Sequence, residues 1–404
     1  MKRCMKEWRR NEMENRWPDA YKVISILENA GFEAYVVGGA VRDFVRGVKA
    51  NDVDITTNAL PLQVKELFEH TIDVGIDHGT VLVVLSEPIE VTTFRSETTY
   101  SDHRRPDEVT FVHTLEEDLK RRDFTINSMA LTKEDKLIDL FGGKSDLLHK
   151  VVKAVGNPKE RFSEDALRML RAIRFSAQLD FTLDSATEAA IKVLHPLIIH
   201  ISIERVKVEL EKIWMSDYPS KGMDLFTSTG LSKHFVGNWE ASACWSDFES
   251  FGIKANGWAF LILMNKDSSY REILSAYKCS NIEKKHVKEV LVAVDCLKKG
   301  RWDSVELFQF SEEVLIAASS YGRVLYKIKH SYTPEKIIEE KRKLAISSKR
   351  DVVISGNDLM EWKQDKRGPW IKEALDKITI MILNKEIKND RAQIKEWFFR
   401  EYNN

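Results

Sequence analysis

The sequence lacks several features that would assign a class of protein at once. Its 404 residues contain no apolar run near the ~20 residues that span a bilayer, so we expect no membrane-spanning segment. Its four cysteines form no C-x-x-C pair and no metal-ligand spacing, which indicates reduced thiols and a cytoplasmic protein. Its net charge of −1 gives no support for nucleic-acid binding, so any such surface must be a local patch.

The pattern of the chain changes near residue 160. Before it, strand-like runs alternate with short helical patterns, and after it helical periodicity with charged faces dominates. The predicted fold class is an α+β head with a mixed β-sheet and helices, followed by an all-α region. The expected strands are 33–37, 52–56, 79–85, 89–94 and 108–112, with a polar loop at 95–107 and helices at 18–30, 40–46 and from the Thr114 cap to Leu131.

Two motifs near the start of the chain indicate nucleotide chemistry. An apolar strand ends in Gly38 and Gly39, and a short helix follows, so the glycines lie at a helix N-terminus that suits an anion. Asp52 and Asp54 are expected on one face of the next strand, where two carboxylates repel each other unless a cation lies between them. A hard divalent ion such as Mg²⁺ is the natural partner, and Glu90 is a candidate third carboxylate.

A cationic segment follows at residues 119–127. Asp123 is expected to orient one of the neighbouring arginines and to leave the other for a triphosphate or a sugar edge. Asn127 is expected one helical turn beyond Asp123, on the same face.

A second charged stripe is expected on a helix over residues 164–175. Asp165, Arg168, Arg171 and Arg174 recur every three residues, while the apolar residues between them supply a core face. Three arginines beside one aspartate leave a net positive charge, which an anionic ligand would neutralise.

Asp165 and Arg168 also have the chemistry of a base reader. An aspartate accepts from an exocyclic amine, and an arginine donates to a ring nitrogen or carbonyl. Cytosine and adenine present that combination, whereas guanine and uracil would leave buried polar groups unpaired. The pair is therefore expected to admit C and A and to reject G and U.

Together these stretches resemble the class II tRNA nucleotidyltransferases, the CCA-adding enzymes of the DNA polymerase beta superfamily. The resemblance covers nearly the whole chain and is most specific in the first 175 residues. The motifs that carry it are VVGGAVRD (36–43), DVDI (52–55), EVTTF (90–94), LKRRDFTIN (119–127), DLFGG (139–143) and ERFSEDALRMLRAIRF (160–175).

The resemblance implies a seahorse-like layout of head, neck, body and tail. The corresponding ranges are a flexible N-terminal extension (1–17), a catalytic head (18–157), a neck with the base-reading helix (158–215), and a body (216–330) and a tail (331–404) that bind tRNA. It also implies substrates CTP, ATP and tRNA, with no membrane contact and no evident protein partner.

The resemblance assigns roles to single residues. Asp52 and Asp54 would bind two catalytic Mg²⁺ ions, and Gly39 and Arg42 would contact the nucleotide. The rest of the nucleotide pocket would consist of Arg122, Asp165, Arg168, Arg171 and Arg174. In the reaction implied, the tRNA 3′-hydroxyl attacks the α-phosphate of CTP twice and then that of ATP.

The polar loop at 95–107 is expected to move and thereby change the shape of the single nucleotide pocket, so that it accepts ATP after CTP. Its hydrogen-bonding side chains are Glu97, Tyr100, Asp102, Arg104 and Arg105.

The helical region beyond residue 215 is expected to bind tRNA through contacts to its phosphates rather than to its bases. Its candidate contacts are Lys341, Arg342, Lys343, Lys349 and Arg350.

Three other functions remain open from the sequence. The nearest is a bacterial poly(A) polymerase, against which the intact loop and the absence of a strongly basic C-terminal extension argue. A second is an enzyme that adds only CC or only A. The third is an inactive RNA-binding protein, which would have no use for the paired carboxylates of Asp52 and Asp54.

Overall fold

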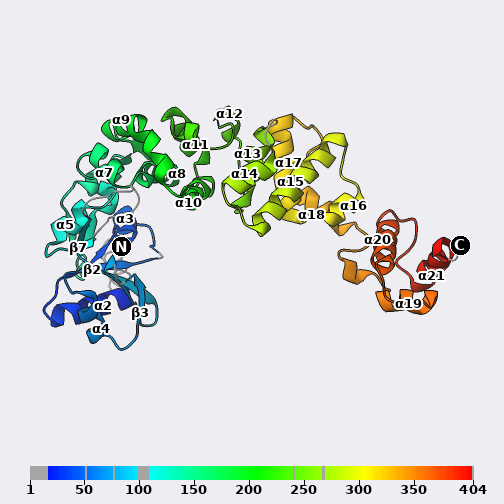
Figure 1. The fold of residues 1–404 in the computed structure, drawn as a ribbon, viewed down its shortest axis with the longest axis horizontal. Coiled ribbons are helices and arrows are strands. Elements are labelled where there is room, and N and C mark those ends of the chain that lie inside the picture. Colours follow the sequence, from blue (N-terminus) through cyan, green and yellow to red (C-terminus); the bar gives the residue numbers. More distant parts are fainter. Residues whose placement is uncertain are drawn as a thin grey trace, which may run out of the picture. The chain divides into compact units, whose positions relative to one another are not determined.

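The computed structural model describes residues 17–50, 52–75, 78–97, 109–239, 242–265 and 269–402. The chain divides into two compact units, residues 1–235 and 236–404 (Figure 1). Strands occur in the first unit, and the described part of the second unit is helical. In the described residues no helix is both long enough and apolar enough to cross a membrane.

A seven-stranded mixed sheet forms the centre of the first unit, in the order β3-β4-β5-β2-β1-β8-β9. The β2–β5 pair is parallel, and the other neighbouring pairs are antiparallel. The strands are β1 (Ala34–Val37), β2 (Asp54–Thr57), β3 (Thr71–Gly75), β4 (Thr80–Val84), β5 (Pro88–Thr93), β8 (Met129–Leu131) and β9 (Leu137–Asp139). Two short pairs lie outside it: β6 (Arg95–Glu97) with β7 (Val109–Phe111), and β10 (Val151–Val152) with β11 (Thr182–Leu183).

The helices of the first unit start and end where the sequence carries caps. Pro18 occupies the first turn of α2, and Gly31 just beyond it has a positive φ of 88°. The helices are α2 (Pro18–Asn29), α3 (Gly39–Arg46), α4 (Pro61–Leu67), α5 (Leu115–Lys120), α6 (Gly143–Leu148), α7 (Pro158–Glu164), α8 (Leu167–Leu179), α9 (Ser185–Leu194), α10 (Ile203–Trp214) and α11 (Pro219–Ser228), with 3₁₀ turns η2 (Thr125–Asn127), η3 (His195–His200) and η4 (Leu231–His234).

The prediction of one helix from the Thr114 cap to Leu131 is wrong beyond Lys120. Thr114 caps it as predicted, because its side chain accepts from the N–H of Glu117, but α5 ends at Lys120. The Asp123 side chain accepts from the next backbone N–H at 2.8 Å, which competes with helical bonding. The chain then bridges to residues 153–155 and reaches β8 through the 3₁₀ turn η2. Asp123 and Asn127 therefore do not share an α-helix, although the Asn127 amide still donates to Asp123.

Two boundaries near the carboxylates also differ from the prediction. Strand β2 begins at Asp54, so Asp52 precedes the strand, and strand alternation does not place the two side chains on one face. The start of the predicted loop, residues 95–97, is strand β6, which pairs with β7. Residues 98–108, with most of the loop positions, lie outside the described residues.

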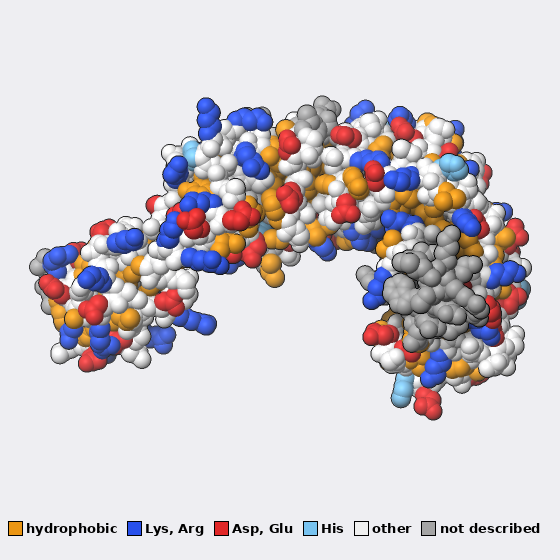
Figure 2. All heavy atoms as spheres, turned by 180° about the vertical axis from the view of Figure 1, so that it is seen from behind, with side chains coloured by type: hydrophobic (Ala, Val, Ile, Leu, Met, Phe, Trp, Pro, Cys, Tyr) orange, Lys and Arg blue, Asp and Glu red, His pale blue; other side chains and the backbone are white. Residues whose placement is uncertain are grey.

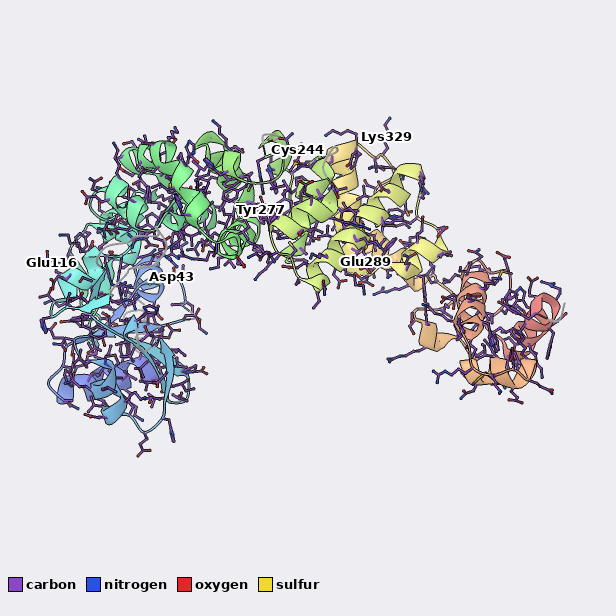
Figure 3. All side chains as sticks on the ribbon, viewed as in Figure 1. Asp43, Glu116, Cys244, Tyr277, Glu289 and Lys329 are labelled. Carbon is purple, nitrogen blue, oxygen red and sulfur yellow. The ribbon has the colours of Figure 1, made fainter. Side chains whose placement is uncertain are left out.

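The second unit is a stack of helices with an aromatic interior. Tyr277 (labelled in Figure 3) lies with its ring 4.4 Å from that of Trp258, and its hydroxyl donates to the carbonyl of Val236. Its helices are α12 (Ser242–Trp245), α13 (Ala255–Met264), α14 (Tyr270–Ala276), α15 (Asn281–Lys299), α16 (Ser304–Gln309), α17 (Glu312–Tyr326), α18 (Pro334–Arg342), α19 (Gly356–Lys363), α20 (Trp370–Leu383) and α21 (Arg391–Tyr402), with the 3₁₀ turn η5 (Lys349–Asp351).

Candidate functional site

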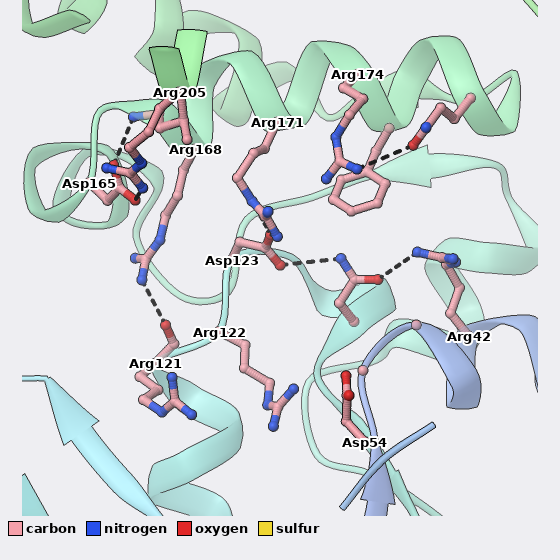
Figure 4. Close-up of a pocket in the computed structure, with 16 residues that line it drawn as sticks. Arg42, Asp54, Arg121, Arg122, Asp123, Asp165, Arg168, Arg171, Arg174 and Arg205 are labelled. Carbon is pink, nitrogen blue, oxygen red and sulfur yellow. Dashed lines mark hydrogen bonds and ion pairs between the residues drawn. The ribbon is translucent and has the colours of Figure 1, made fainter. Parts of the chain in front are cut away.

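A pocket of about 570 Å³ in the first unit collects most of the predicted site residues (Figure 4). Seven arginines and three aspartates contribute to its lining, so the lining carries an excess of positive charge. The predicted residues that line it are Gly38, Gly39, Arg42, Asp54, Arg122, Asp123, Asn127, Asp165, Arg168, Arg171 and Arg174. Sequence positions up to 136 residues apart therefore meet at one cavity.

The glycine turn between β1 and α3 brings the backbone close to two charged groups. Gly38 has φ 74° and ψ −136°, a conformation that side chains strongly disfavour. A Cβ built on Gly38 would lie 3.5 Å from a guanidinium nitrogen of Arg122 and 3.7 Å from a carboxylate oxygen of Asp54. The sequence pattern of two glycines before a helix thus corresponds to a real close approach.

Asp54 is the carboxylate of the predicted metal site that lines this pocket, and two others are close to it in the fold or the sequence. Asp54 and Glu90 are register partners on the parallel strands β2 and β5, and Asp52 lies two residues before Asp54. Desolvation, followed by the charge of Glu90, raises the pKa of Asp54, although Arg122 opposes the shift. All three carboxylates also line a second hollow, of about 440 Å³, which shares Asp54 with the first.

The carboxylates supply oxygen ligands of the kind that Mg²⁺ prefers. Within the described residues, however, no three acidic, histidine or cysteine side chains form a complete ligand cluster. Protein Mg²⁺ sites commonly use one or two carboxylates together with substrate phosphates. These carboxylates therefore fit Mg²⁺ ions whose remaining ligands come from the phosphates of a bound nucleotide.

Asp165 lies between two helices rather than on one. It ends α7 with extended backbone angles (φ −131°, ψ 104°), and α8 begins two residues later at Leu167. One Asp165 oxygen accepts from the N–H of Leu167 at 3.0 Å, and the other pairs with Arg205 of α10 at 2.8 Å. The predicted single stripe is thus correct only for the three arginines, which project from α8 in Figure 4.

The arginines of α8 are individually paired, which corrects the expected charge imbalance. Arg168 is 2.7 Å from Glu164, and Arg174 is 2.7 Å from Glu209 of α10. Arg168 also donates to the carbonyl of Arg121 at 3.0 Å, which joins α8 to the end of α5. The apolar face that was predicted for this helix is confirmed, since Leu170 and Ile173 are fully buried.

Asp123 links α8 to the glycine turn. Arg171 donates to it at 2.8 Å from Nε, and the side-chain amide of Asn127 donates to it at 3.2 Å. Asn127 in turn accepts from Arg42 at 3.1 Å. Burial alone would raise the pKa of Asp123, but the charge and hydrogen bonds of Arg171 outweigh it and lower the pKa to about 2.

The neighbours of Asp123 differ from the prediction. Asp118, not Asp123, pairs with both adjacent arginines, with Arg121 at 2.8 Å and with Arg122 at 3.0 Å. Asp118 is fully buried, and the two guanidinium charges outweigh the effect of burial and lower its pKa.

Phe175 is a site residue that the sequence did not reveal. Its ring is buried at the pocket, and the guanidinium carbons of Arg174, Arg42 and Arg171 lie 4.1, 5.5 and 5.7 Å from its centroid. These distances are typical of cation–π contacts.

The other residues missed from the sequence are acids and an arginine that hold the pocket in place. Glu164 could have been found, because it lies four residues before Arg168 on the same stretch. Arg205 and Glu209 could not, because they come from α10, and no local pattern connects them to α8.

Comparison with known families covers both units. The profile of the poly A polymerase head domain matches residues 34–153, and that of tRNA nucleotidyltransferase domain 2 matches residues 250–398. A third profile, described as an RNA and SrmB binding site of polymerase A, matches residues 180–241.

Individual relatives match over nearly the full length. The CCA-adding enzyme of Bacillus cytotoxicus is 40% identical over 388 residues, which are 95% of this chain and 98% of the relative. That of Listeria monocytogenes is 40% identical over 386 residues, 94% of this chain and 97% of the relative. The crystal structure of the Bacillus stearothermophilus CCA-adding enzyme in complex with CTP matches with a TM-score of 0.81 at 33% identity, over 96% of this chain and 98% of that one.

Proposed function

This chain belongs to the family of CCA-adding enzymes, and we propose on that basis that it adds C, C and A stepwise to the 3′ end of tRNA. The substrates would be CTP and ATP, without a nucleic-acid template. The observation that carries the proposal is the meeting of Asp54, the glycine turn and the arginines of α8 around one pocket. A single cavity with an acidic edge and a cationic lining suits one nucleotide at a time.

The positive lining would hold the triphosphate. Guanidinium groups match phosphate geometry and form strong charge-assisted hydrogen bonds. Arg42, Arg171 and Arg174 surround Phe175, so their guanidiniums are held close together before any ligand binds. The helix α3, which begins at Gly39, adds the backbone N–H groups of its first turn.

Asp165 and Arg168 would read the base. Asp165 is anchored by Arg205 and Arg168 by Glu164, so both side chains have fixed positions at the pocket. A carboxylate oxygen has two lone-pair sites, so Asp165 can keep its anchor and still accept from the amine of cytosine or adenine.

Two Mg²⁺ ions would be held by Asp52 and Asp54, with Glu90 as a further candidate ligand. When bound, such ions acidify the attacking hydroxyl and neutralise the charge that develops on the leaving pyrophosphate. The side chains around the pocket align the α-phosphate, and the reaction needs no covalent enzyme intermediate. None of the described cysteines forms a disulfide, as is usual in the reducing cytoplasm, and we place the reaction in that compartment.

Purified protein with defined tRNA transcripts tests the proposal. With Mg²⁺ present, a transcript lacking CCA should gain two residues from CTP alone and none from ATP alone. A transcript that ends in CC should gain one residue from ATP, and UTP and GTP should give little product. Removal of Mg²⁺ with a chelator should abolish every addition.

The same assay separates the alternatives. A poly(A) polymerase would add many A residues, with no requirement for the CC end. An enzyme of divided function would add only CC or only A. An inactive RNA-binding protein would bind the transcripts and extend none of them.

A further inference from the structure

The lysines expected to grip tRNA in the tail are mostly engaged with the protein itself. Lys341 donates to two backbone carbonyls, those of Leu307 and Phe310, each at 2.7 Å. Lys343 pairs with Glu340 and Lys349 with Asp376. These three lysines therefore already have partners within the second unit. Figure 2 shows basic and acidic side chains mixed over the visible face of the chain.

A hollow between α14 and α15 has a different composition. It has a volume of about 480 Å³. The described residues that line it include no carboxylate and are Tyr270, Arg271, Leu274, Lys284, Lys285 and Lys288. Two hollows lined by residues of the C-terminal helices, in contrast, include Asp358 and Asp376 among their lining residues.

The cations of this hollow are weakly compensated. Lys284 and Lys288 lie one helical turn apart on α15, where like charges destabilise a helix. Neither has a carboxylate within ion-pair distance among the described residues, and Lys285 reaches Glu289 only at 3.8 Å. On the facing helix, Arg271 donates to the hydroxyl of Tyr270 at 3.2 Å rather than to an acid.

We propose that this hollow is a contact site for the sugar–phosphate backbone of tRNA. A concave surface whose described lining has four cations and no acid presents several positive groups to an anionic chain at once. Leu274 in its lining is buried and apolar, and the four cations are of the kind that contacts phosphates without reading sequence. Such a contact suits an enzyme that must accept every tRNA. The inference rests on the proposed function, because it takes tRNA as the ligand.

The double variant Lys284→Ala/Lys288→Ala tests the site in the full-length protein. Alanine maintains helix α15, and both side chains lie at the surface, so the fold should persist. Binding of a tRNA transcript lacking CCA should weaken at low salt. The slope of log K against log salt concentration should fall by about one for each lost phosphate contact. The KM for tRNA should rise, while the KM for CTP at saturating tRNA should not change.

Two variants serve as controls. Lys284→Arg/Lys288→Arg keeps the charges and should keep affinity and salt slope. Lys65→Ala/Lys336→Ala removes the same number of charges, but Lys65 pairs with Asp73 and Lys336 with Glu339 and Glu340, so it should leave binding close to that of the wild type. The inference is overturned if the Lys284→Ala/Lys288→Ala variant binds with wild-type affinity and slope, or if the Lys65→Ala/Lys336→Ala control weakens binding equally. Either outcome would leave CCA addition by the wild-type protein intact, whereas a wild-type protein that extends no tRNA would refute the proposed function itself.

Discussion

Asp123→Asn should both destabilise the first unit and weaken nucleotide binding. The substitution keeps the size of the side chain but removes the charge that pairs with Arg171. The native pKa of Asp123 is lowered from 3.8 to about 2. A pKa unit corresponds to about 1.4 kcal/mol, so the ionised carboxylate contributes about 2 kcal/mol to stability at neutral pH. Arg171 keeps 34% of its side chain exposed, so the loss should stay below the about 3–5 kcal/mol seen for fully buried pairs.

Scanning calorimetry of the full chain is the assay for stability. In a unit of this size, about 2 kcal/mol should lower the Tm of its transition by about 4–8 °C. Because the folded pKa of Asp123 lies below its ordinary value, the stabilisation is complete above that value and is lost as the pH falls through the folded pKa. The difference between variant and wild type should therefore be full at pH 7 and should shrink as the pH falls from about 4 towards 2.

Asp73→Asn is the matched control in the same unit. It also breaks an ion pair, with Lys65 at 3.0 Å, but Asp73 keeps 47% of its side chain exposed against 8% for Asp123, and surface pairs contribute about 0–1 kcal/mol. Asp123→Asn should also raise the KM for both CTP and ATP, because Asp123 orients Arg171 directly and Arg42 through Asn127. A Tm equal to that of the wild type, or an equal loss in the Asp73 control, would refute the reasoning.

Four further sets of variants test other parts of the site. Asp52→Ala or Asp54→Ala should abolish addition of both C and A with tRNA binding largely intact; retained addition by Asp52→Ala at ordinary Mg²⁺ concentrations would contradict the metal assignment. Asp165→Ala should reduce the preference for CTP and ATP over UTP and GTP by about 1–3 kcal/mol, measured as relative incorporation, and unchanged selectivity would mean that it reads no base. Phe175→Leu should raise the KM for both nucleotides without altering base choice. Phe175→Tyr keeps the aromatic ring and should keep the KM close to that of the wild type if the ring holds the arginines. Shortening of residues 97–104 should stall products at CC, whereas equal loss of C and A addition would assign the loop to general catalysis.

The sequence allowed the elements near the glycine motif to be predicted because their signals are local. The helix that begins at Gly39 follows from two glycines after an apolar run, and α2 follows from its proline and glycine boundaries. Segments whose structure depends on distant partners could not be predicted in this way. Residues 121–131 have helical charge spacing, but Asp123 and Thr125 bond to residues 153–155, and β8 pairs with β1. Tertiary pairing outweighed local propensity there.

The site shows the same division. Types and spacing of the arginines on α8 were visible in the sequence, and all three lie at the pocket. The partner of each arginine was not visible, because Asp123 and Glu209 lie 48 and 35 positions from Arg171 and Arg174. The charge of a folded site depends on such pairs. The net positive charge expected from the helix at residues 164–175 alone was therefore a poor guide to the charge of the site.

Those pairs explain how a chain with a net charge of −1 can present a strongly cationic pocket. All seven arginines of the pocket have a carboxylate partner among the described residues. Four of the partner acids, Asp43, Asp118, Glu164 and Glu209, are absent from the lining, so the arginines still contribute most of the charge at the cavity. A guanidinium that is already held in place loses little side-chain entropy when a phosphate binds, and ordering one long side chain costs about 0.5–1.5 kcal/mol. Under the proposed function, the acids would thereby preorganise the nucleotide site. Loss of an acid should weaken nucleotide binding even where it touches no substrate.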